Sequence, residues 1–123
     1  MDADNLLEQQ PQAQAAKEAI AEAARARMVM KHYTLVVRQL PMLLQRHGLG
    51  QTLAYLQQRG GGTPASPYDL VARQLDRWLL KTMAVSARGA LAALSGQDSR
   101  FYREASDQAW LFVRALRRGL EAS

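Results

Sequence analysis

The residues best suited to chemistry in this 123-residue chain are cations, and they lie in a stretch that contains no acid. Between Arg25 and Tyr68 there is no Asp or Glu, whereas there are six basic residues: Arg25, Arg27, Lys31, Arg38, Arg46 and Arg59. The first 24 residues have the opposite balance, with five acidic side chains and one lysine. A block of unneutralised positive charge is typical of a surface that rests against polyphosphate. The sequence therefore predicts contact with a nucleic-acid backbone in the middle of the chain.

Helical periodicity gathers several of these cations on one side. At about 100° per residue, Lys31 and Arg38 lie opposite Val29 and Val36 on a helical wheel. A solvated helix face is the alternative, because charges normally point to water. We predict outward-facing phosphate contacts for four cations of this block: Arg27, Lys31, Arg38 and Arg46.

Two further basic faces follow in the second half of the chain. The nucleic-acid-binding candidates of the fourth predicted helix are Arg73, Arg77 and Lys81. The last helix carries five cations: Arg100, Arg103, Arg114, Arg117 and Arg118. Acids lie nearby in both helices, so an ordinary solvated face explains these two groups as well as RNA contact does.

Trp110 falls among the arginines of the last helix and away from its apolar face. An indole in that place either stacks on a nucleobase, anchors a protein interface, or is covered by another helix of the same domain. The candidate interface residues are Trp110, Arg114 and Arg117.

Catalytic chemistry finds little support. The chain has no cysteine, and neither of its two histidines, His32 and His47, has an acid in its local sequence. The Gly60–Gly62 run lacks the Lys-Ser/Thr that follows the glycines of a phosphate-binding loop. We therefore expect no enzyme, no metal site, no cofactor and no small-molecule substrate.

The segments that carry these cations have the sequence pattern of helices. β-Branched residues are few and no alternating apolar pattern persists, which predicts an all-α bundle of five or six helices. A first helix is expected from Pro11 to about residue 40, with one inner stripe: Ala26, Val29, Tyr33, Val36, Leu40 and Leu43. Pro41 is expected to break or kink this helix or to begin the next one.

Two glycine-containing breaks divide the rest. Gly48 suits a left-handed helix end, and the next helix is expected to reach Arg59 and a flexible Gly/Pro loop over 59–66. Ser66, Pro67 and Asp69 indicate a helix start whose inner face is Tyr68, Val71, Leu75, Trp78 and Thr82. Gly89 is a candidate division before the break at 95–98. The last helix is expected from Ser99 to Glu121, with an inner face of Phe101, Ala105, Ala109, Phe112 and Leu116.

Length and composition limit the number of domains and the type of protein that the chain can form. At 123 residues and 48% hydrophobic content, the chain suits a single domain over 1–123, with residues 1–10 as a frayed acidic tail. No apolar run approaches the roughly 18 residues of a membrane span, and nothing resembles a secretory signal. We expect a cytoplasmic protein without membrane contact.

The segment GLGQTLAYL, residues 48 to 56, follows RQLPMLLQRH and carries a specific resemblance. It resembles the central signature of the small helical subunit of type III-B (Cmr) CRISPR effector complexes. A second stretch, YREASDQAWLFVRALRRGLEA at residues 102 to 122, is similar to the closing helix of that family. Asp107 and the Val113–Arg114 pair depart from the family pattern, which more often has Glu and Asn-Trp there. The small subunit of type III-A (Csm) complexes is the nearest relative with which it could be confused.

The resemblance implies a noncatalytic subunit of an RNA-targeting antiviral complex, with RNA cleavage left to other subunits. Its implied partners are the other effector subunits, further copies of itself, the guide RNA and the target RNA. Two other classes stay open: a protein–protein adaptor that ignores nucleic acid, and a stand-alone helical nucleic-acid binder. The latter has little to read bases with, because the helix after Gly48 offers glutamines and no arginine before Arg59.

Overall fold

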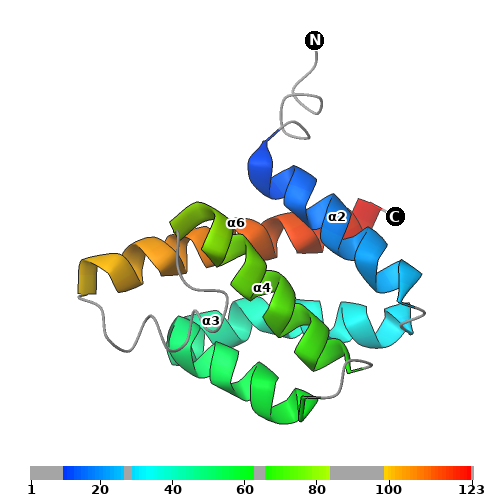
Figure 1. Cartoon of the computed structure of the whole chain (residues 1–123), viewed down its shortest axis with the longest axis horizontal. Coiled ribbons are helices and arrows are strands. Elements are labelled where there is room, and N and C mark those ends of the chain that lie inside the picture. The colour runs from blue at the N-terminus through cyan, green and yellow to red at the C-terminus, as the bar shows by residue number, and fades with distance from the viewer. Residues whose placement is uncertain (1–9, 27–28, 63–65, 84–98, 123) are drawn as a thin grey trace.

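Four helices make up the part of the chain that the computed structural model describes, and no strand occurs there. The described residues are 10–26, 29–62, 66–83 and 99–122. The helices are α2 (Pro11–Arg25), α3 (Met30–Gly60), α4 (Pro67–Met83) and α6 (Ser99–Ala122). They pack into one compact all-α domain in which α2 lies beside α6 and α3 packs against α4 (Figure 1). The all-α prediction is confirmed. The predicted division at Gly89 lies outside the described residues, as does Arg88, a further cation of the fourth predicted helix.

The predicted helix from Pro11 to residue 40 is wrong, because the chain breaks after Arg25. Ala26 ends α2 and its N–H donates to the carbonyl of Glu22 at 3.0 Å. Val29 precedes α3 in an extended conformation, and its carbonyl accepts the N–H groups of His32 and Tyr33. No glycine or proline occurs at this break, and the two helices pack mainly against different neighbours, α2 against α6 and α3 against α4.

This break corrects part of the predicted inner stripe. Ala26 and Val29 are exposed, Val29 with 56% of its surface open to solvent, while Tyr33, Val36 and Leu40 are buried as predicted. Pro41 neither ends nor begins a helix, since α3 runs through it with helical backbone angles. A proline inside a helix loses one backbone hydrogen bond, which the surrounding packing must offset.

Helix α3 turns sharply at Gly48, whose φ of 79° and ψ of 172° are not helical. The bend divides α3 into a first arm, residues 30–47, and a second arm, residues 49–60, which runs back at an angle to the first (Figure 1). Counting the arms separately gives five helical segments among the described residues, close to the predicted five or six. Gly48 has the positive φ that the prediction requires, but its ψ of 172° lies outside the left-handed helical region.

The second arm ends and α4 begins as the sequence indicates. Gly61 takes the left-handed conformation, and its N–H donates to the Gln57 carbonyl at 3.1 Å. Helix α4 starts at Pro67, where the carbonyl of Ser66 accepts the Leu70 N–H at 3.0 Å. Part of the predicted 59–66 loop is helical, because α3 includes Arg59 and Gly60.

The core lies between the inner faces of all four helices. Leu49, Leu53 and Leu56 are each at most 1% exposed, as their spacing predicts. Trp78 of α4 stacks on Phe112 of α6 with ring centroids 5.7 Å apart, and its indole N–H donates to the Gln108 carbonyl at 2.8 Å. The predicted inner faces of α4 and α6 are buried in their middle turns and half-buried at their ends, at Tyr68, Thr82 and Phe101.

One buried polar network joins three helices through Gln74. The Tyr33 hydroxyl donates to Gln74 Oε1 at 2.7 Å, and Gln74 Nε2 donates to the Ala19 carbonyl at 2.9 Å and to Glu22 at 3.0 Å. Burial raises the pKa of the Tyr33 hydroxyl well above its ordinary range, so it stays protonated and remains a donor. A satisfied network of this kind fixes how α2, α3 and α4 sit together.

Candidate nucleic-acid interface and neighbouring surfaces

The first arm of α3 presents an exposed stripe in which cations and large apolar side chains alternate. Steps of four, three, four and four residues place its members on one side of the helix: Lys31, Leu35, Arg38, Met42 and Arg46. Leu35 and Met42 are each 49% exposed. We call this stripe the α3 face. Sequence reasoning identified its cations and missed Leu35 and Met42, although the same spacing contains them.

The cations of the α3 face carry uncompensated charge. Four ion pairs are formed among the described residues, and none includes Lys31, Arg38 or Arg46. Neither Lys31 nor either arginine makes any other polar contact with that part of the chain. Arg27 lies outside the described residues. Three predicted phosphate-binding residues therefore share one open face.

The α4 candidates have a different environment. The Arg73 guanidinium contacts Asp69 at 3.0 Å, and Arg77 donates two hydrogen bonds to the Glu22 carboxylate, at 3.1 and 3.2 Å. The bond from Arg77 holds the pKa of Glu22 below its usual range. Lys81 is exposed. Both arginines thus have a carboxylate partner within the fold, and their predicted RNA contacts stay predictions.

The candidate interface residues of α6 form two separate contacts. Trp110 is half-buried against the core, and the Arg114 guanidinium lies 5.3 Å from the centroid of its ring. Arg117 pairs with Glu121 at 3.5 Å. Trp110 is therefore partly covered by its own domain and partly open beside a cation.

A second aromatic and cationic cluster lies where the second arm of α3 meets α4. Arg59 is exposed, and its guanidinium lies 5.9 Å from the Tyr55 ring and 5.1 Å from the Tyr68 ring. Its hydrogen bond to the Tyr68 hydroxyl, at 3.4 Å, raises the pKa of Arg59. The spacing of Tyr55 and Arg59 by four residues is visible in the sequence, but the approach of Tyr68 depends on the turn between the helices.

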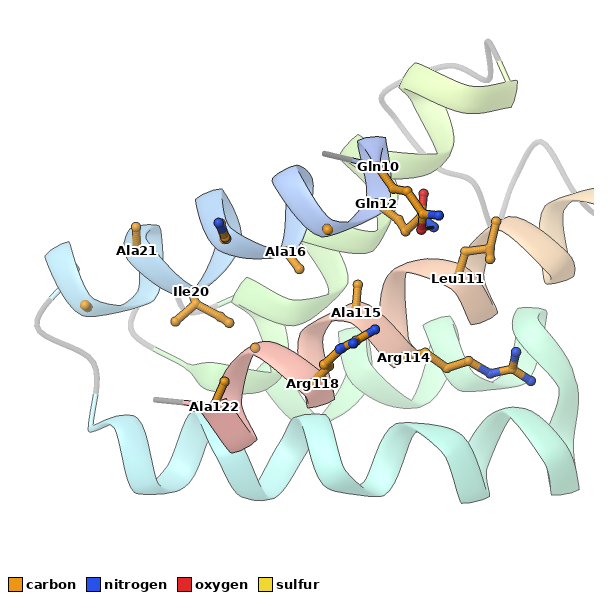
Figure 2. A pocket seen from close by; sticks show the side chains of 14 residues that line it. Gln10, Gln12, Ala16, Ile20, Ala21, Leu111, Arg114, Ala115, Arg118 and Ala122 are labelled. Carbon is orange, nitrogen blue, oxygen red and sulfur yellow. Dashed lines mark hydrogen bonds between the residues drawn. The ribbon is translucent and has the colours of Figure 1, made fainter. Parts of the chain in front are cut away.

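A groove of about 750 Å³ runs between α2 and α6. Figure 2 shows Gln10, Gln12 and Leu111 at one end of it and Ala122 toward the other. We call it the α2/α6 groove. Its wall and floor are mainly small or apolar, and its fourteen lining residues include three cations, Lys17, Arg114 and Arg118, and no carboxylate. Sequence reasoning did not anticipate this groove, because it depends on how two distant helices pack.

Side chains that bind metal ions stay apart in the described part of the chain. Within residues 10–26, 29–62, 66–83 and 99–122, no three His, Cys, Asp or Glu side chains gather closely enough to hold a metal ion. None of the described helices is long and apolar enough to cross a membrane. His32 and His47 are both exposed.

The chain matches the model of a known family. The model of a family described as CRISPR-associated protein (Cas_Cmr5) matches residues 8–123. No curated protein matches the chain. The matched range includes every described helix, the α3 face, the α2/α6 groove and both sequence stretches that carry the resemblance to the small Cmr subunit.

Proposed function

The chain belongs to the Cas_Cmr5 family of CRISPR-associated proteins, and we propose that it is the noncatalytic small subunit of a type III-B RNA-targeting ribonucleoprotein. Family membership makes it a subunit of the Cmr complex, with the other effector subunits as its partners. Beyond this membership, we propose that the α3 face contacts RNA, that other subunits cleave the RNA, and that several copies of the chain pack together.

The α3 face supports RNA contact. Its three cations span about 22 Å along the first arm, at a rise of roughly 1.5 Å per residue. None of them forms an ion pair with a described residue, so phosphate binding would neutralise charge that this part of the fold leaves unpaired. Leu35 and Met42 lie between them and suit contact with sugars or base faces, without hydrogen bonds that read a base. Base pairing with the guide would then supply sequence selection, while the protein holds the backbone.

A noncatalytic role is supported by what the titratable side chains do. Glu22 is bonded to Arg77 and Gln74, and Asp69 is bonded to Arg73, so both carboxylates serve the fold. A general acid or base needs a reacting group within hydrogen-bond reach and a partner that orients it. The exposed His32 and His47 have no such carboxylate partner among the described residues.

The experiment that tests RNA contact compares two variants that lose the same charge. Arg38→Ala/Arg46→Ala removes two cations of the α3 face, and Arg100→Ala/Arg103→Ala removes two exposed cations of α6. Binding to a single-stranded RNA is measured over a range of salt concentration. The first variant should bind more weakly, and its log-log salt slope should fall by about 0.7 for each phosphate that the protein no longer neutralises.

The control variant should bind more nearly like the wild type. Equal weakening in both variants would mean that the α3 face is an ordinary solvated surface. Failure of the wild-type protein to bind either RNA or a guide-containing particle would favour the adaptor alternative. A tagged copy used to recover the guide RNA from cells gives the second measurement.

A further inference from the structure

We propose that the α2/α6 groove binds the acidic, leucine-bearing segment 2–8 of a second copy of this chain. The inference rests on the multicopy part of the proposed function and supplies the contact for it. It also gives a role to the acidic beginning of the chain, which the RNA-binding surface does not use.

The groove has the shape of a docking site for one further segment. Gly119 of α6 lies against Ile20 of α2, and a Cβ on Gly119 would lie 2.8 Å from Ile20 Cδ1. The helices approach closely there, and both residues line the groove. Leu111, which is 38% exposed, stands at one end. Such grooves accept an amphipathic segment that lays its apolar side chains between two helices.

The positive charge of the α2/α6 groove favours the binding of an acidic segment. Arg118 makes no ion pair with any described residue, and Arg114 contacts only the Trp110 ring there. Segment 2–8, DADNLLE, carries Asp2, Asp4 and Glu8 without any cation, and Leu6 and Leu7 supply apolar side chains. Opposite charges steer such a segment to the rim and fix its register, while the leucines enter the groove.

The length of the segment suits the groove. The α2 wall from Ala13 to Ala24 is about 16 Å long. Seven residues span roughly 10 Å as a helix and about 23 Å when extended, so the wall length lies between these limits.

The position of Gln10 favours a second copy over the segment of the same chain. Gln10 lines one end of the groove and precedes α2 with extended backbone, φ −67° and ψ 145°. A segment entering its own groove would have to reverse direction within the one or two residues before Gln10. A segment from another copy has no such constraint. The contact joins two different surfaces, so it is heterologous and extends from copy to copy unless a ring closes.

Exchange of charge between two full-length variants tests the proposal. The groove variant is Arg114→Glu/Arg118→Glu, and the tail variant is Asp2→Lys/Asp4→Lys/Glu8→Lys. Self-association is followed by sedimentation velocity at low ionic strength. The wild-type mass should rise with concentration, whereas each variant alone should associate at least about tenfold more weakly, because like charges then meet. An equimolar mixture should regain association, since the basic tail of one variant fits the acidic groove of the other.

Arg100→Glu/Arg103→Glu is the matched control, because it makes the same charge change at exposed positions outside both the groove and the α3 face, and it should associate as the wild type does. Thermal melts check that every variant is folded. The proposal is overturned if the wild type stays monomeric at every concentration, or if two folded variants do not recover association when mixed. Loss of stability in the tail variant without change in mass would place the segment in its own groove and also overturn it. RNA binding by the wild type, measured separately, decides the proposed function.

Discussion

The hydroxyl oxygen of Tyr102, on α6, accepts a hydrogen bond from the backbone N–H of Gly50 at 2.9 Å. The bend at Gly48 interrupts the helical ladder, so the first N–H groups of the second arm need partners from elsewhere. Tyr102 supplies one of them across 52 residues of sequence. A Cβ on Gly48 would lie 3.0 Å from the same oxygen, so the bend admits the hydroxyl because residue 48 is glycine.

Tyr102→Phe should lower the free energy of unfolding by about 1 kcal/mol, because the part-buried Gly50 N–H loses its acceptor. Urea titration measures the change. Tyr68→Phe is the control, since its hydroxyl bonds only the exposed Arg59 among the described residues. Equal stability of wild type and Tyr102→Phe would show that water replaces the hydroxyl at no cost.

Gly48→Ala should destabilise more, by about 1–3 kcal/mol from the backbone alone, because a φ of 79° with a ψ of 172° is a conformation that essentially only glycine adopts. Its Cβ adds a tight contact with the Tyr102 hydroxyl. The double variant Gly48→Ala/Tyr102→Phe should therefore cost less than the sum of the two single changes. Gly62→Ala has positive φ and nothing within 4 Å of its Cβ, so it isolates the backbone strain. A strictly additive double variant would contradict this coupling.

Much of the fold follows from local signals. Gly48 and Gly61 mark the ends of helical segments through a positive φ that other residues adopt poorly, and Pro67 marks a helix start because its fixed φ suits the first turn; these boundaries agree with the structure. The break after Arg25 has no such residue. The helical spacing of apolar residues continues across it, and the predicted helix was therefore too long. At Pro41 the sequence signal is present but the break is absent. Proline is a strong helix breaker, yet α3 continues through it.

The sequence predicts which site residues share a face of one helix, but it does not predict the contacts between helices. Lys31, Arg38 and Arg46 share a face because helical spacing places them there. The pairing of Arg77 with Glu22 joins residues 55 positions apart and depends on how α4 crosses α2. The α2/α6 groove is likewise a property of two helices from opposite ends of the chain.

Glu22→Gln should reduce the acid sensitivity of the protein. The folded-state pKa of Glu22 is lowered by its bond to Arg77, so its stabilising contribution is present above the ordinary value of 4.5 and is lost as pH falls below it. The variant should lose about 1 kcal/mol at neutral pH and show a smaller fall of stability on acidification. Unfolding measured from neutral pH to about pH 3 checks this. Parallel pH profiles of the two proteins would contradict it.

Thr52→Val should leave stability unchanged or raise it by up to about 1 kcal/mol. Thr52 is fully buried, and its hydroxyl has no hydrogen-bond partner in the described part of the chain. A helical threonine usually bonds the carbonyl four residues earlier, which here belongs to the non-helical Gly48. Valine keeps the shape and removes the unsatisfied group. A clear loss of thermal stability would reveal a partner for the hydroxyl.

Leu35→Ser/Met42→Ser should change the unfolding free energy by no more than about 0.5 kcal/mol per residue, because both side chains are half exposed. RNA affinity should fall while the salt slope stays that of the wild type, since every cation that neutralises a phosphate is still present. Leu44→Ala, at a buried position of the same arm, should instead cost about 2–5 kcal/mol in stability. Unchanged affinity in the double serine variant would restrict the RNA contact to the cations.

The packing of α2 beside α6 affects folding during synthesis on the ribosome. The first described helix of the chain buries its apolar face mainly against the last described helix, which is synthesised later. Until Ser99–Ala122 has left the ribosome, α2 can contact only α3 and α4 among the described helices and lacks the neighbour against which it packs most extensively. Chains cut short before α6 would expose this apolar face to quality control. Only a finished polypeptide would then be admitted to assembly.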